Sequence, residues 1–323
     1  MILAGNEQIK SLTAAMISKG REPHSLIITG EHGQGRKTAA KYIAAAMLCE
    51  SGTGVPCESC RTCRMIKDGV HPDFMVLKAN DNGNYPVDDI RAVVADAVVA
   101  PNEGRLKVYL IPDFDKSKVT GEQVQNILLK LIEEPPDHVV MILTADSREA
   151  FLQTILSRTV CLGVSPCSKE ECISYIGSLE KYEYSDIAQA VDSLGGNIGS
   201  CIDFLEKGLI YSAVGKARQV AAALLSGSEY ELLKTLTECD GAKGLLRMTL
   251  VQLCLIIRDS AVSSFGGELI GCASHTSQEL SRKYDRARSE KLYRIISEHI
   301  ARLDRSCSKL LVINSLCAEL SGI

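Results

Sequence analysis

Four cysteines stand close together in the first quarter of the sequence, with the spacing Cys49-x7-Cys57-x2-Cys60-x2-Cys63. Cys-x2-Cys steps let successive sulfurs face one ion, and four thiolates around Zn²⁺ form a closed structural site with no place for water. A redox role would need only two sulfurs and a thioredoxin-like context, which this sequence lacks. An iron–sulfur cluster would use the same four thiolates, and metal analysis must separate the two. We therefore predict a metal site at residues 49–63, with structural Zn²⁺ as its ion.

A glycine-rich segment follows a predicted strand and opens a predicted helix, the place where backbone N–H groups can wrap a phosphate. Its candidate nucleotide-binding residues are Gly30, Gly33, Gly35, Arg36, Lys37 and Thr38. In a working P-loop the last glycine is followed by Lys, which binds the terminal phosphates, and then by Ser or Thr, which holds Mg²⁺. Arg36 and Lys37 stand in those places here. A shift of one residue would bring Lys37 and Thr38 into them, but it breaks the glycine spacing.

We interpret this segment as a degenerate P-loop. Nucleotide binding and an inherited turn with solvated charges both remain open, and we expect ATP and Mg²⁺ to be unbound or unhydrolysed. A second altered position supports this expectation. The strand predicted over residues 108–111 should end in an acidic pair that holds Mg²⁺, but it ends in Pro112-Asp113-Phe114-Asp115. Proline has no ligand atom, and Asp113 and Asp115 also suit a turn at a strand exit.

A single arginine, Arg158 in Ser157-Arg158-Thr159, follows a predicted strand and helix near the end of the first half. Such an arginine would be able to reach a neighbouring subunit and stabilise the charge on its γ-phosphate, where a finger supplied in trans raises the rate by about 10³ to 10⁵. Judged by position alone, a surface salt bridge is the more common role.

The elements that must position these residues are an alternation of apolar strands and helices, typical of a parallel α/β sheet. Apolar runs without alternation predict strands covered on both faces at residues 26–29, 74–77, 108–111 and 139–144. Helices are predicted at residues 38–49, 90–99 with Asp88 and Asp89 as caps, and 122–134 before Pro135-Pro136. Ser168 and Glu171 have the spacing of a capping box. From residue 209 onward the pattern is helical throughout, as in a helix bundle.

Composition limits the possible classes of function. The 323 residues are 46% hydrophobic and 24% charged, which is typical of a globular chain of two or three domains. The net charge of −4 excludes a general basic coat and so disfavours a free-standing DNA-binding protein. The sequence shows neither a signal segment nor an apolar run of membrane-spanning length, so we expect a cytoplasmic protein.

Three segments together carry a family resemblance: the cysteine insertion after the P-loop helix, the string from Asn126 to Pro136 (NILLKLIEEPP), and Ser157-Arg158-Thr159. The chain resembles the bacterial clamp-loader subunits of DNA polymerase III, which are AAA+ proteins. The resemblance is sharp over residues 3–162 and weakens beyond. It implies an α/β fold in three domains. These are an AAA+ P-loop-type sheet domain with the zinc module at 1–163, a small helical lid at 164–207, and an all-α collar for oligomerisation at 208–323.

Within that family the departures at Arg36, Lys37 and Pro112 resemble the delta-prime subunit. Gly199 points the same way, since the ATP-hydrolysing gamma/tau motor has a sensing arginine there. The resemblance implies a stator of the polymerase holoenzyme that helps load the sliding clamp onto primed DNA and has no ATPase activity of its own. It implies gamma/tau and delta subunits as partners, with indirect contact to clamp and primer-template DNA in the replisome at the nucleoid.

By the same resemblance Arg158 becomes the trans-acting arginine finger, with Ser157 in the accompanying motif. Two alternatives remain. The first is the gamma/tau motor of the same complex, which would hydrolyse ATP with Lys37, Thr38 and Asp113. The second is a zinc-dependent interaction module without a role in clamp loading.

Overall fold

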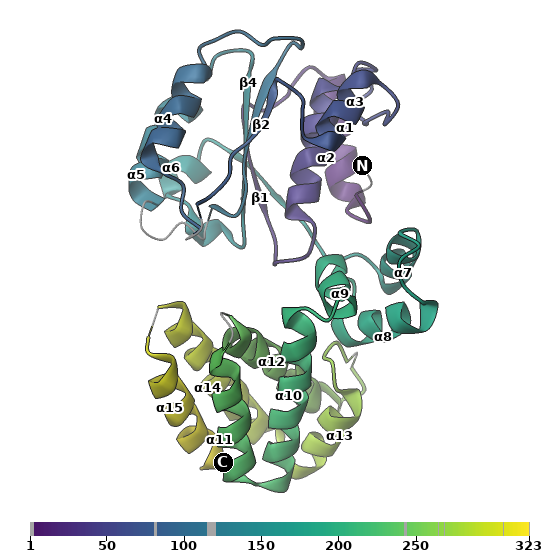
Figure 1. The fold of residues 1–323 in the computed structure, drawn as a ribbon, viewed down its shortest axis with the longest axis vertical. Coiled ribbons are helices and arrows are strands. Elements are labelled where there is room, and N and C mark those ends of the chain that lie inside the picture. Colours follow the sequence, from purple (N-terminus) through teal and green to yellow (C-terminus); the bar gives the residue numbers. More distant parts are fainter. Residues whose placement is uncertain are drawn as a thin grey trace. The chain divides into compact units, whose positions relative to one another are not determined.

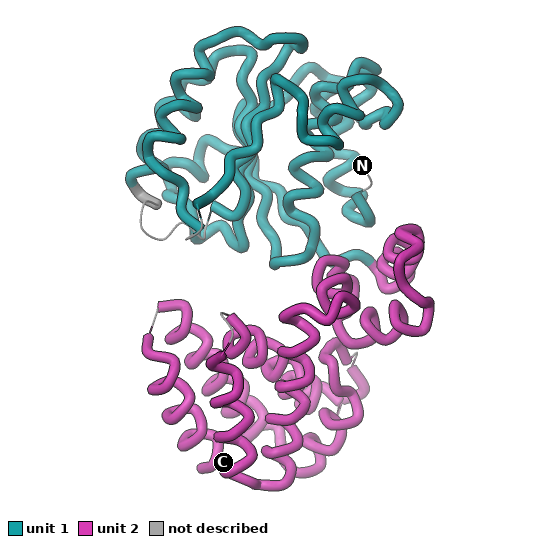
Figure 2. The backbone as a smooth tube through the Cα atoms, viewed as in Figure 1, with its two compact units in different colours: residues 1–167 teal, residues 168–323 magenta. Residues whose placement is uncertain are grey.

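The computed structural model describes residues 3–80, 83–114, 121–241, 244–263, 265–267, 269–305 and 307–322. They form two compact units, residues 1–167 and residues 168–323, drawn in teal and magenta in Figure 2. The first unit is a parallel sheet between helices, and the second is helical. The predicted division of the helical part at residues 207 and 208 stays a prediction.

The sheet of the first unit has five strands within the described residues, all parallel, in the order β2-β3-β4-β1-β5. The strands are β1 (Ser25–Thr29), β2 (Phe74–Val76), β3 (Lys107–Ile111), β4 (Val139–Ala145) and β5 (Val160–Gly163). The four predicted strands are confirmed. Every residue of β1, β3 and β4 is buried, which explains their unbroken apolar runs. The prediction that every strand is covered on both faces was wrong for β2, which lies at the edge of the sheet and has Met75 42% exposed. Strand β5 was not predicted.

Helices cover both faces of the sheet. Figure 1 shows α1 (Glu7–Ser18), α2 (Arg36–Leu48) and α3 (Arg61–Asp68) on one side, and α4 (Val87–Asp96), α5 (Gly121–Glu133) and α6 (Gln153–Leu156) on the other. Side chains of a strand alternate between the faces, so Leu26 and Ile28 pack with α2 while Ile27 packs with α5. Two apolar cores result, one on each face, and together they fix the helices that carry the candidate site residues.

Helices α2 and α4 begin two and three residues earlier than the sequence predicts. Helix α2 begins at Arg36 rather than at Thr38, because Gly35 takes a left-handed conformation as its N-cap. Helix α4 begins at Val87 after Pro86, so Asp88 and Asp89 lie in its first turn and do not cap it. Acidic side chains in a first turn still favour the helix by interacting with its dipole.

The second unit consists of helices in all its described elements. They are α7 (Lys169–Gly177), α8 (Tyr184–Leu194), α9 (Ile198–Leu205), α10 (Leu209–Ser226), α11 (Glu229–Glu238), α12 (Leu245–Ser263), α13 (Ser274–Lys283), α14 (Arg286–Asp304) and α15 (Lys309–Ser321). The predicted capping box is present, because Ser168 accepts a hydrogen bond from the backbone of Glu171 and the Glu171 side chain bonds back. Helix α12 packs against α10, α13 and α14 and forms the centre of this unit.

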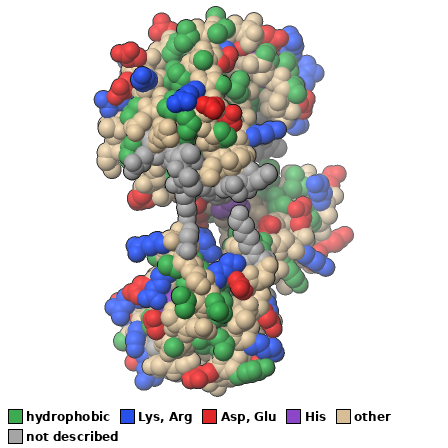
Figure 3. All heavy atoms as spheres, turned by 60° about the vertical axis from the view of Figure 1, so that its left-hand side comes forward, with side chains coloured by type: hydrophobic (Ala, Val, Ile, Leu, Met, Phe, Trp, Pro, Cys, Tyr) green, Lys and Arg blue, Asp and Glu red, His purple; other side chains and the backbone are tan. Residues whose placement is uncertain are grey.

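Charges of both signs lie on the surface of either unit. On the face drawn in Figure 3, Lys and Arg side chains are interspersed with Asp and Glu side chains. This mixture agrees with the formal net charge of −4. In the part of the chain that the structure describes, each helix is too short or too polar to cross a membrane.

Candidate functional site

The structure brings the four predicted cysteines together between α2 and α3. Cys49 directly follows the last residue of α2, and Cys60 is the N-cap of α3. The four sulfurs all lie within 4.8 Å of one another, and the Sγ atoms of Cys49 and Cys60 are 4.0 Å apart. Four sulfurs about 2.3 Å from one tetrahedral ion lie about 3.8 Å from each other. The cluster therefore has the donor set and the size that a four-thiolate metal site needs.

Backbone N–H groups point at these sulfurs. The amides of Cys57, Cys60 and Cys63 lie 3.4 Å, 3.3 Å and 3.3 Å from the Sγ atoms of Cys49, Cys57 and Cys60. Three of the four sulfurs, those of Cys49, Cys57 and Cys60, thus accept a backbone N–H group, which stabilises thiolates and hence a bound cation.

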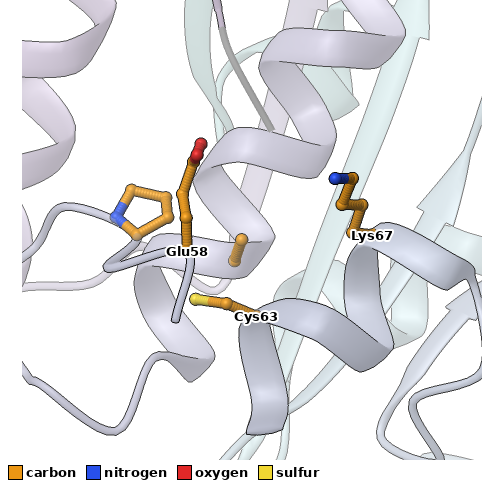
Figure 4. A pocket seen from close by; sticks show the side chains of 5 residues that line it. Glu58, Cys63 and Lys67 are labelled. Atoms are coloured by element: carbon orange, nitrogen blue, oxygen red, sulfur yellow. The ribbon is translucent and has the colours of Figure 1, made fainter. Parts of the chain in front are cut away.

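Two thiols of the cluster have pKa values that are shifted in opposite directions. The Ser59 hydroxyl and neighbouring amides lower the pKa of Cys57 to about 6, whereas burial raises the pKa of Cys63. A cation binding here would displace the proton from Cys63. Figure 4 shows the Cys63 sulfur beside a small pocket, with the side chains of Glu58 and Lys67 around it.

The glycine-rich loop has the backbone of a phosphate-binding loop. Gly30, Gly33 and Gly35 have φ values of 155°, 86° and 90°, in the region that favours glycine. A Cβ atom on Gly30 would lie 2.3 Å from the Cγ2 atom of Val164, so this position also has no room for a side chain. The loop joins β1 to α2, as predicted.

The side chains after the loop are bound by the chain's own carboxylates. The Arg36 side chain is 4% exposed, and its Nη2 atom lies 3.2 Å from the Oδ1 atom of Asp113. Its Nη1 atom forms a second ion pair with Asp146. Lys37 is 55% exposed, and its Nζ atom lies 2.7 Å from the other Asp113 oxygen. Arg36, Lys37, Asp113 and Asp146 thus form one network, which we call the P-loop ion cluster.

Asp113 is the centre of this cluster. Its backbone has a left-handed φ of 50°, and its N–H donates to the Thr144 hydroxyl at 2.9 Å. The carboxyl ends of parallel strands meet at one edge of a sheet, so Asp113 after β3 and Asp146 after β4 both face the loop after β1. Asp146 was missed from the sequence. Its only signal is an acidic residue directly after an apolar strand. Asp115 lies outside the described residues.

The predicted finger arginine lies just after α6. Arg158 is 45% exposed, and its Nη1 atom donates to the Thr154 carbonyl at 3.1 Å and the Ser157 hydroxyl at 3.2 Å. Its Nε atom lies 3.3 Å from the Oε1 atom of Glu133. Within the described ranges no hydrogen bond or ion pair joins Arg158 to residues 30–38. Arg158 and the degenerate loop are therefore separate features of the first unit.

Comparison with known proteins identifies the family. A family model described as "DNA polymerase III, delta subunit" matches residues 5–168, half of the chain. DNA polymerase III subunit gamma of Buchnera aphidicola (subsp. Schizaphis graminum) is 28% identical over 210 residues, which are 63% of this chain and 56% of that protein. Subunit tau of Escherichia coli (strain K12) is 34% identical over 157 residues, 48% of this chain and 24% of that protein. The chain thus spans about half or less of the length of these curated relatives.

Two solved structures align with nearly the whole chain. A DNA polymerase III gamma subunit-related protein of Thermotoga maritima aligns over 98% of this chain and 99% of its own, with a TM-score of 0.46 and 16% identity. The clamp loader delta protein of Bacillus subtilis aligns over 96% and 98%, with a TM-score of 0.38 and 12% identity. The family assignment depends on the match over residues 5–168, which includes the cysteine cluster, the P-loop ion cluster and Arg158. The chain therefore belongs to this DNA polymerase III family of clamp-loader subunits.

Proposed function

We propose that this protein is a delta-prime-like subunit of the clamp loader, a stator that hydrolyses no ATP itself and completes the ATP site of a neighbour with Arg158. The observation that carries the proposal is the P-loop ion cluster. A working P-loop presents its cation to phosphate and its acidic residue to Mg²⁺. Here Arg36 and Lys37 are both paired with Asp113, so cation and acid neutralise each other within the chain.

Nucleotide would have to break this cluster in order to bind as it does in a motor subunit. Arg36 is 4% exposed but its partners Asp113 and Asp146 are 19% and 47% exposed, so separating them costs less than the about 3–5 kcal/mol of a fully buried ion pair. Mg²⁺ would meet Pro112, which offers no side-chain ligand, and an Asp113 already bound to two cations. The ion pairs of Arg36 and the replacement at Pro112 both oppose ATP hydrolysis by this chain.

Arg158 is suited to act outside its own chain. A guanidinium has five N–H donors. In Arg158 the Nε and Nη1 atoms have partners within the chain, and in the described residues the Nη2 atom has none. This half-exposed side chain therefore presents two donors for the oxygens of a phosphate on an adjacent subunit, as a finger supplied in trans requires.

The cysteine cluster has a structural role in this proposal. Cys49, Cys57, Cys60 and Cys63 would hold one Zn²⁺, which in a closed four-thiolate site supplies folding energy and no catalysis. The cluster ties the end of α2 to the start of α3, because Cys49 and Cys60 belong to those two helix ends. It therefore fixes the loop between them.

The partners in the proposal are the gamma/tau and delta subunits, with the sliding clamp and primer-template DNA reached through them. Residues 1–163 would be the AAA+ core, 164–207 the lid and 208–323 the collar. Exposed apolar side chains on two contacting helices support a collar that binds other subunits: Tyr230 and Leu233 on α11, and Leu310 and Leu311 on α15. They are between 42% and 71% exposed.

The test is equilibrium binding of Mg-ATP to the isolated, zinc-loaded chain, with hydrolysis followed in the same sample. The proposal expects no turnover and at most weak binding. Steady Mg²⁺-dependent hydrolysis that is lost in Lys37→Met would favour the gamma/tau alternative, and gamma and tau are the subunits that the names of the curated relatives give. Failure of the purified chain to join gamma/tau and delta subunits in one complex would favour an interaction module outside clamp loading.

A further inference from the structure

Arg158 is carried by a segment that is too short to hold itself in place. Helix α6 has four residues, Gln153–Leu156, and a helix of this length has no stability of its own in water. Its fully buried Ile155 and its partly buried Leu156 pack against the apolar core on this face of the sheet. These two apolar contacts hold the segment against the core, and polar contacts from a neighbouring element direct the arginine.

Helix α5 supplies these contacts near its start. Gln125 is 4% exposed, and its amide binds the segment before α6 with both of its ends. Its Nε2 atom donates to the Ala150 carbonyl at 3.0 Å, and its Oε1 atom accepts from the Leu152 amide at 2.7 Å. A buried side chain that makes two hydrogen bonds to backbone fixes that backbone in position and orientation.

A second contact lies at the end of the same helix. Glu133 is the last residue of α5, and its Oε1 atom lies 3.3 Å from the Nε atom of Arg158. Glu133 lies eight positions after Gln125 in the helix, a rise of about 12 Å. Helix α5 is itself anchored by the buried Leu128 and Ile132. It can therefore act as a rigid support along the whole length of the arginine segment.

We propose that Gln125 and Glu133 are positioning residues, which through helix α5 orient Arg158 so that its Nη2 atom faces a phosphate outside the chain. This inference rests on the proposed function of Arg158. Glu133 binds Nε, while Thr154 and Ser157 bind Nη1, so three contacts define the plane of the guanidinium. An arginine held in one plane loses less side-chain entropy when it binds a phosphate with two parallel hydrogen bonds.

The chain offers a matched control for Glu133. Glu134 follows it in the sequence, is also exposed, and within the described residues has no ion pair. Glu133→Gln and Glu134→Gln change the net charge equally, and only the first removes the ion pair with Arg158. Because Glu133 is 45% exposed, Glu133→Gln is expected to leave the fold intact. Gln125→Met tests the buried contact, with the melting temperature as a check on folding.

The experiment measures DNA-stimulated ATP hydrolysis by the complex assembled from gamma/tau, delta and this chain. Glu133→Gln is expected to lower the rate by about 3-fold to 10-fold, since a small misplacement of a catalytic group has effects of this order or more. Glu134→Gln is expected to leave the rate unchanged. The double variant Glu133→Gln/Arg158→Ala is expected to match Arg158→Ala alone, because a positioning residue acts only through the group that it positions.

A second readout uses the isolated chain. The rate at which phenylglyoxal modifies Arg158, followed by mass spectrometry, is expected to rise in Glu133→Gln and to stay unchanged in Glu134→Gln. If Arg158→Ala hydrolyses ATP normally in the complex, the proposed function of Arg158 fails. If Arg158→Ala is impaired but Glu133→Gln behaves as Glu134→Gln in both assays, the positioning role alone is overturned. A double variant slower than Arg158→Ala would also overturn it.

Discussion

Replacing Arg36 tests the P-loop ion cluster most sharply. Arg36→Met keeps a long apolar stem but removes the guanidinium from two carboxylates. Losing one partner of a fully buried pair costs about 3–5 kcal/mol. Asp146 is 47% exposed and Asp113 keeps Lys37, so water and the remaining cation offset part of this loss. We expect a destabilisation of about 2 kcal/mol, which for a unit of this size lowers the melting temperature by about 4–8 °C.

Lys37→Met is the matched control, because Lys37 binds the same Asp113 and stands next in the sequence. Its side chain is 55% exposed, and exposed ion pairs contribute about 0–1 kcal/mol. The control is therefore expected to lower the melting temperature by about 0–4 °C. The assay is calorimetric or circular-dichroism melting of the zinc-loaded chain at equal ionic strength. If Arg36→Met is as stable as Lys37→Met, the ion pairs of Arg36 do not stabilise the fold, and the reasoning is refuted.

Two further predictions concern the metal site and acid stability. Chelation or Cys63→Ser is expected to remove one bound zinc per chain and to lower the melting temperature. Cys254 is a buried cysteine outside the cluster, so Cys254→Ser is expected to retain the metal. Metal analysis checks both outcomes, and a colourless protein excludes an iron–sulfur cluster. Burial alone would raise the pKa of Asp73, but the amides of residues 102–104 outweigh it and hold the pKa below its ordinary value of 3.8. Asp73 therefore stabilises the fold above about pH 4 and loses this effect as the pH falls. In urea unfolding, Asp73→Asn should remove that part of the pH dependence. If the free energy of unfolding falls with acid as steeply in Asp73→Asn as in the natural chain, Asp73 is not its cause.

The predictions that succeeded depend on residues that are near in sequence. The spacing of Cys57, Cys60 and Cys63 brings their sulfurs together within one loop and one helix turn, so the sequence was sufficient to place them. The three central strands are buried on both faces, which produces unbroken apolar runs. Strand β5 has a single buried residue and lies at the edge of the sheet, so its four residues carry little of this signal.

The contacts that the sequence did not reveal join distant segments. Arg36 and Asp146 are 110 positions apart, and only the strand order places the ends of β1 and β4 side by side. Sequence spacing shows that the P-loop lysine is replaced, but not that the replacement is paired with two carboxylates. The pairing of Glu133 with Arg158 is similar. Both residues lie in segments that carry the family resemblance, yet their contact depends on the packing of α5 against α6.

In the proposed function, this chain completes the ATP site of a neighbour with Arg158. The most direct measurement compares DNA-stimulated ATP hydrolysis by complexes assembled with the natural chain, with Arg158→Ala, and with Arg148→Ala as an exposed arginine in the preceding turn. Hydrolysis at the site that Arg158 completes is expected to fall by about 10³-fold or more in Arg158→Ala and to be unchanged in Arg148→Ala. Equal rates in all three complexes, at equal assembly, would contradict this role of Arg158.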